Sequence, residues 1–196
     1  MEIEVTEAQA NEYNALYKRA IGLVRRHALI DGEPQLGPPG WFARRRLRKG
    51  MGLFERALAI APFKWECRFW IGKSLQRLGE HKEAMSWFME AMRQEPDNAT
   101  IAKEAANEAF ELGEFELGVG LLRPATLNRP DDPILHYDLG VQLLLAGRPK
   151  EAYESLERAA RLEAHPNTSR LMNYVERVMM GQVPCPRSAH ELRQGA

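Results

Sequence analysis

The side chains best suited to catalysis in this sequence are five histidines, and their positions form no catalytic pattern. They are His27, His81, His136, His165 and His190. None of them has a nucleophile or a carboxylate at a spacing that a helix would bring together, which acid–base or nucleophilic catalysis requires. The sequence therefore predicts a protein that is not an enzyme and has no catalytic residues.

The two cysteines likewise suggest no metal or cofactor chemistry. Cys67 and Cys185 lie 118 residues apart and belong to no CxxC or Cys/His cluster, so we expect neither a disulfide framework, nor a metal site, nor a cofactor. We expect Cys67 to be a buried packing residue. Cys185 stands between two prolines and is either a bystander or an exposed reactive thiol.

Charged residues balance overall but not locally. The formal net charge is zero, from 27 basic and 27 acidic residues. Residues 18–50 hold nine basic residues against two acidic ones, and residues 90–116 hold eight acidic residues against two basic ones. The densest basic group consists of Arg44, Arg45, Arg46, Arg48 and Lys49. Two interpretations stay open: solvated helix faces, or a patch that docks an acidic partner, with nucleic acid the weaker form.

Composition indicates an all-α, cytoplasmic protein. The sequence contains 24 Ala and 23 Leu against 18 Val, Ile and Thr together, so strong helix formers dominate. The acidic first residues lack the basic and apolar stretches of a secretory signal, and the longest apolar run elsewhere is residues 143–146. We therefore expect no membrane anchor and no membrane partner.

The elements that must position any site follow a 34-residue period. Glycines recur at positions 79, 113, 147 and 181, alanines at 57, 91, 125 and 159, and prolines at 62, 96 and 130. Another column is always small, with Gly50, Ala84, Gly118 and Ala152. Such a period indicates stacked units of two antiparallel helices, because one unit cannot bury its apolar face alone.

The segment from Trp65 to Pro96 resembles the tetratricopeptide repeat family, since it fills every signature position, including Gly72, Ala84 and Ala91. The resemblance implies a right-handed α-solenoid over residues 1–180. We expect three clear repeats at 65–98, 99–132 and 133–166, and a capping helix at 167–180. A divergent first repeat is expected at 6–62, with an inserted loop at 31–40, and residues 181–196 are expected to be an irregular tail.

By the same resemblance, the first helix of each repeat lines a concave groove that binds a partner peptide or helix. The groove positions are Phe69, Lys73, Gln76, Lys103, Asn107, Phe110, Tyr137, Val141 and Leu144. Their apolar members form either a slot for a ligand side chain or a surface covered by the protein's own terminal segments. The family's clamp for C-terminal carboxylates is incomplete, because Asp138, Thr168 and Met172 replace its Asn, Lys and Arg.

The resulting expectation is an adaptor or scaffold that binds a protein or peptide partner. A secretion-type chaperone is the runner-up within the same fold, and an immunity or inhibitor protein acting through its charged surface is the contrasting class. Nucleic acid is an unlikely partner. End-to-end stacking makes a homo-oligomer possible, and the sequence does not decide it.

Overall fold

In a computed structural model, which describes residues 6–28 and 38–195, every regular element is an α-helix. This confirms the all-α prediction. The chain divides into two compact units, residues 1–96 and 97–196, and each is described by itself. Most of the loop expected at residues 31–40 lies outside the described residues.

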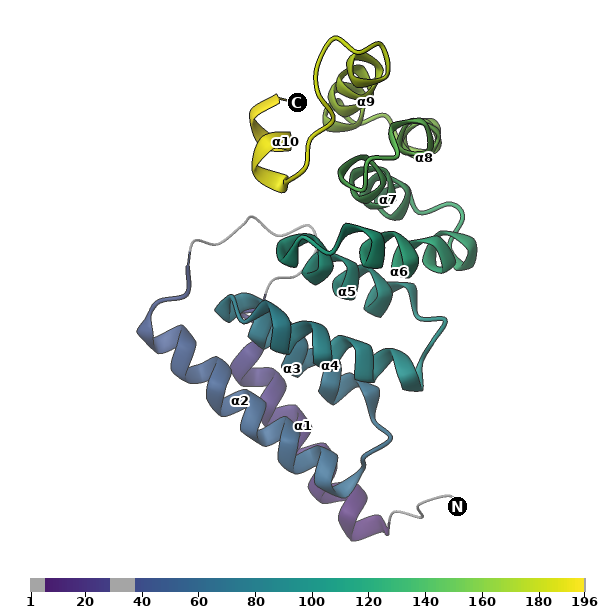
Figure 1. Cartoon of the computed structure of the whole chain (residues 1–196). Helices are drawn as coiled ribbons and strands as arrows, with labels where there is room; N and C mark the ends of the chain where they lie inside the picture. The colour runs from purple at the N-terminus through teal and green to yellow at the C-terminus, as the bar shows by residue number, and fades with distance from the viewer. Residues whose placement is uncertain (1–5, 29–37, 196) are drawn as a thin grey trace. The chain divides into compact units, whose positions relative to one another are not determined.

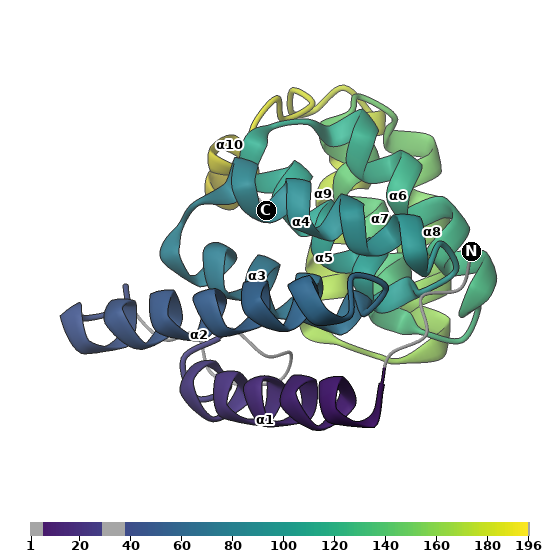
Figure 2. The same ribbon diagram turned by 90° about the horizontal axis from the view of Figure 1, so that it is seen from below.

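The first unit contains two antiparallel helix pairs. Helices α1 (Glu7–Val24) and α2 (Trp41–Ile60) form one pair, and α3 (Trp65–Leu78) and α4 (His81–Gln94) form the other. Helix α1 begins with a capping box, in which the Thr6 hydroxyl accepts from the Gln9 amide and the Gln9 side chain accepts from the Thr6 amide. Figure 2 shows that the N-terminal end of α2 extends past both α1 and α3.

The second unit repeats this arrangement and adds two further helices. Its pairs are α5 (Ala99–Leu112) with α6 (Phe115–Asn128), and α7 (Pro133–Leu145) with α8 (Pro149–Leu162). Helix α9 (Pro166–Met179) packs on α8, and α10 (Ala189–Gly195) follows after a turn (Figure 1). Residues 189–195 are thus helical, which differs from the expected irregular tail.

The 34-residue columns correspond to helix ends. The glycines of the first column have φ between +70° and +79°, a left-handed conformation that a Cβ disfavours and that ends a helix in a tight turn. Asn98 and Asp132, which are 34 residues apart, cap α5 and α7 by accepting hydrogen bonds from amides of the first turn. Local sequence therefore sets the helix boundaries.

Small residues determine how closely paired helices approach. A Cβ built on Gly72 would lie 2.7 Å from the Phe88 ring, and one built on Gly140 would lie 2.7 Å from Leu156. Phe88 and Leu156 are both fully buried. The large residue of one helix therefore fills the space above the glycine of its partner.

Candidate partner-binding groove

The first helices of successive pairs in the second unit line a pocket of about 440 Å³. Helices α5, α7 and α9 form its walls, and α10 covers one end. The lining residues are Asn107, Phe110, Tyr137, Asp138, Val141, Gln142, Asn167, Arg170, Leu171, Leu192 and Arg193. The pocket is thus apolar at its centre and carries polar or charged groups around it.

A second pocket, of about 250 Å³, continues from the first toward the N-terminal ends of α7 and α9. Tyr137 and Asn167 line both pockets. The far end of the second pocket contains Ile134, whose side chain is exposed, and the His165 side chain, which caps α9. We call the two connected pockets the C-terminal groove.

Hydrogen bonding and burial fix the floor of the C-terminal groove. The buried Gln142 side chain donates from Nε2 to the Ala106 carbonyl oxygen over 2.8 Å and so ties α7 to α5. Burial, followed by the negative charge of Asp138, raises the pKa of Tyr137. Tyr137 therefore remains a neutral phenol at physiological pH, able to donate or accept a hydrogen bond.

The structure brings together four of the nine predicted groove residues, namely Asn107, Phe110, Tyr137 and Val141. Two other predicted groove residues in this unit are buried: Lys103 is 8% exposed and Leu144 is fully buried. The prediction that Lys103 and Leu144 line an open groove is therefore wrong. Leu144 lies under the C-terminal segment, since the Cys185 thiol donates to its carbonyl oxygen.

The other three predicted groove residues belong to α3 of the first unit. Lys73 is only 4% exposed, so its predicted place on an open groove surface is also wrong. Phe69 packs its ring against Trp65, Trp70 and Phe88, with ring centroids 5.8–6.2 Å apart. Gln76 is half-buried, and neither it nor Phe69 lines the C-terminal groove.

The predicted basic patch lies on α2 in the first unit, and all five of its residues are exposed. Trp41 and Phe42 begin the same helix and are 64% and 77% exposed, with their ring centroids 4.7 Å apart. The Arg45 guanidinium stands over the Trp41 ring at 5.6 Å. We call these seven residues the α2 surface.

Two family models described as tetratricopeptide repeats match residues 66–98 and 103–167, which together make up half of the chain. The chain belongs to the tetratricopeptide repeat family. Repeats of this family are typically non-enzymatic interaction modules, and the fold supports a role as a protein-interaction scaffold. No curated protein sequence matches the chain.

Several solved structures share the tetratricopeptide fold with this chain. MamA from Desulfovibrio magneticus RS-1 is 14% identical, with a TM-score of 0.70 over 97% of this chain and 94% of that one. MamA AMB-1 is 18% identical, with a TM-score of 0.67 over 93% and 94%. The first tetratricopeptide domain of Spaghetti (RPAP3), bound to the HSP90 peptide SRMEEVD, is 17% identical, with a TM-score of 0.57 over 60% and 94%.

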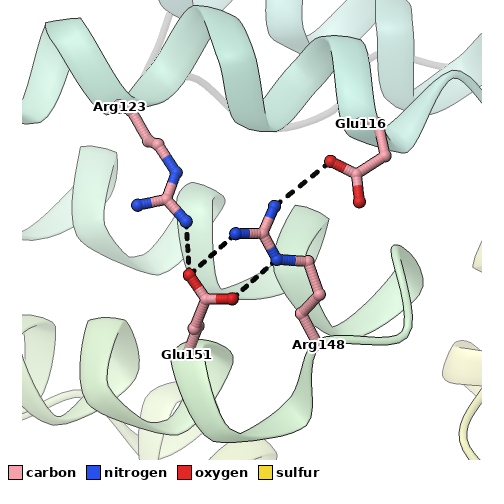
Figure 3. Close-up of polar contacts among 4 residues, drawn as sticks. All are labelled: Glu116, Arg123, Arg148 and Glu151. Atoms are coloured by element: carbon pink, nitrogen blue, oxygen red, sulfur yellow. Dashed lines mark hydrogen bonds and ion pairs between the residues drawn. The ribbon is translucent and has the colours of Figure 1, made fainter.

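An ion-pair network joins the second helices of adjacent repeats in the C-terminal unit (Figure 3). Arg148 binds Glu151 through two hydrogen bonds of 2.7 and 2.8 Å and reaches Glu116 on α6 over 3.2 Å. Arg123, also on α6, binds the same Glu151 carboxylate. These two hydrogen-bonded guanidinium groups lower the pKa of Glu151 to about 2. The network thus holds α8 against α6, and so helps to set the distance between α7 and α5 in the groove.

Several groove residues were not predicted. Leu171 lies 34 residues after Tyr137, so extending the groove columns into α9 could have found it. Gln142, Asn167 and Arg170 lie on groove helices outside the chosen columns, and residues of α10 carry no repeat signal. Within residues 6–28 and 38–195, no helix has the length and apolar character of a membrane span. In the same residues, no three His, Cys, Asp or Glu side chains gather at a possible metal site.

Proposed function

We propose that this tetratricopeptide protein is an adaptor that holds a short partner segment in the C-terminal groove. The observation that carries the proposal is the continuity of the two pockets through Tyr137 and Asn167. The larger pocket has the volume of a typical ligand site, and its neighbour extends it along α7 and α9. Such an elongated groove suits a peptide or a helical turn.

The lining predicts the chemistry of the partner segment. Phe110, Val141 and Leu171 offer an apolar contact for one large side chain. Asn107, Asn167 and Arg170 surround it with hydrogen-bonding groups for a backbone or a polar neighbour. The solved RPAP3 domain, whose fold is similar, carries a seven-residue peptide, and this supports peptide binding by analogy.

The partner segment differs from the carboxylate-terminated peptides that the family's clamp binds. Asp138 lines the C-terminal groove where that clamp has an Asn, and Thr168 lines the second pocket where it has a basic residue. An acidic terminus placed there would meet a like charge. The burial of Leu144 also shortens the apolar slot that a secretion-type chaperone would offer. We therefore favour the adaptor over the chaperone.

Site-specific photo-crosslinking in the source cells tests the groove. The variant Val141→p-benzoylphenylalanine carries the crosslinker inside the groove, and Leu127→p-benzoylphenylalanine carries it on α6 at a side chain that is 80% exposed. We expect one partner species to cross-link at position 141 and not at 127. Adding Tyr137→Ala should weaken that cross-link about tenfold, which is typical of a buried aromatic anchor. Equal labelling at both positions would reject the groove.

The α2 surface favours a second candidate function, binding of an acidic protein partner as an inhibitor would. Exposed aromatic rings beside a dense set of guanidinium groups are typical of interaction hot spots. An acidic partner that binds there should bind about tenfold more weakly to Arg45→Glu, and its affinity should fall steeply with added salt. Binding that ignores both changes would exclude this surface.

A further inference from the structure

The C-terminal segment folds back onto the groove helices. After Gly181 ends α9 in a tight turn, the Tyr174 hydroxyl donates to the Pro184 carbonyl oxygen over 3.4 Å. The Cys185 thiol then donates to the Leu144 carbonyl oxygen on α7 over 3.3 Å. Arg193 reaches Glu111 on α5 over 3.8 Å. The segment thus contacts all three helices that line the C-terminal groove.

The centre of this contact is Leu192. Its side chain is only 8% exposed, although it belongs to a helix of seven residues close to the chain end. It lines the same pocket as Phe110, Val141 and Leu171. Leu192 therefore fills part of the apolar space that the proposed function assigns to a partner side chain.

The individual contacts of the segment are weak. A thiol is a poor hydrogen-bond donor, and the ion pair between Arg193 and Glu111 joins two exposed side chains. A helix as short as α10 is not stable by itself, so the groove must hold it in place. A segment with this balance is docked by one apolar side chain and can exchange with a competitor.

We propose that residues 183–195, the C-terminal strap, are a built-in ligand of the C-terminal groove, and that the partner is an amphipathic segment that displaces the strap. The proposal rests on the proposed function and names its partner chemistry. The partner presents a leucine-sized side chain at the place of Leu192 and a basic residue at the place of Arg193. Because only the strap-free state is open, the docked strap lowers the apparent affinity for the partner by the fraction of open chains.

Cys185 is a natural reporter of strap docking. When the strap is docked, the thiol is half-buried and hydrogen-bonded, and burial raises its pKa. A released strap would expose a thiol of ordinary pKa, which reacts faster because thiolate is the nucleophile. Cys67 is fully buried, and burial raises its pKa to about 11, so it contributes little background.

The first test measures the rate at which N-ethylmaleimide labels Cys185 in the full-length chain, with the site assigned by peptide mass spectrometry. Leu192→Asp should increase the rate about tenfold or more, since a carboxylate cannot enter the apolar pocket. The matched control His190→Asp adds the same charge to α10 at an exposed position and should leave the rate near the wild-type value. Circular dichroism checks that each variant is folded. A rate in Leu192→Asp equal to that of the control would overturn the strap.

The second test addresses the partner chemistry and needs no identified partner. A fluorescein-labelled synthetic peptide with the sequence of residues 183–195 is titrated into the Leu192→Asp chain, whose groove is vacated. We expect saturable binding, at least about tenfold weaker binding to the wild-type chain, and none for the same peptide carrying Leu192→Asp. Absence of saturable binding up to millimolar protein would overturn the partner assignment. Because neither test uses the cellular partner, failed crosslinking at position 141 would remove the proposed function alone.

Discussion

Helix α2 offers a comparison between two glycines that the structure separates clearly. A Cβ built on Gly50 would lie 2.3 Å from the Val24 Cγ1 atom and 3.5 Å from the Ala20 carbonyl oxygen, both on α1. A Cβ built on Gly52 would have no neighbour within 4 Å. The variants Gly50→Ala and Gly52→Ala therefore make the same chemical change two residues apart in very different surroundings.

The expected energies follow from packing and from helix propensity. Val24 is fully buried and β-branched, so it has little rotamer freedom with which to avoid a new methyl group. Overpacking of this kind costs about 1–3 kcal/mol. Replacing glycine by alanine within a helix contributes about 0.5–1 kcal/mol of stability in both variants. Gly52→Ala should therefore be more stable than wild type, and Gly50→Ala should be less stable than Gly52→Ala by about 1–3 kcal/mol, because the propensity gain cancels in the comparison.

Urea unfolding followed by tryptophan fluorescence measures this difference. All four tryptophans precede residue 96, so their fluorescence reports the first unit, which contains both glycines. A second arm places Gly50→Ala in a Val24→Ala background, where the added methyl group should cost almost nothing because its neighbour is gone. If Gly50→Ala proves as stable as Gly52→Ala, the close contact between α1 and α2 is not what limits the residue at position 50.

The remaining predictions concern an ion pair and a helix end. The Glu151 carboxylate should titrate near pH 2 in carbon-detected NMR, and Arg148→Met should move this midpoint upward toward the ordinary range near about 4. Because the folded-state pKa is the lower one, the site's stabilisation is complete above the ordinary pKa and is lost as the pH falls toward 2, so Arg148→Met should also unfold at a higher pH in an acid titration. Gly113→Ala should destabilise the chain by about 1 kcal/mol in urea unfolding, because φ is +76° at this position. An exposed-helix control, Gly120→Ala, should not destabilise it, since a Cβ there meets nothing within 4 Å.

The sequence predicted the helix pairs because the signals that define them are local and repeated. Each helix-ending glycine occupies a backbone conformation that its own column requires, and Asn98 and Asp132 cap helices within three residues of themselves. Observed helices α3 to α8 begin and end within one residue of the predicted pairs. A unit that contacts only its neighbours leaves the same pattern every 34 residues, and this pattern can be read without knowing any distant contact.

Column positions state which way a side chain points, but not what lies above it. The small-residue column accepts alanine at positions 84 and 152, and only the tertiary structure shows that Val24 fills the equivalent space at Gly50. Lys73 and Lys103 occupy groove columns and are nevertheless buried.

The C-terminal strap illustrates the same limit, because its seven-residue helix has no repeat signal and forms where the groove offers Leu192 an apolar contact. The sequence therefore determined the repeating unit, which depends on local interactions. Tertiary packing decided which parts of the groove are open, because burial depends on segments that are distant along the chain.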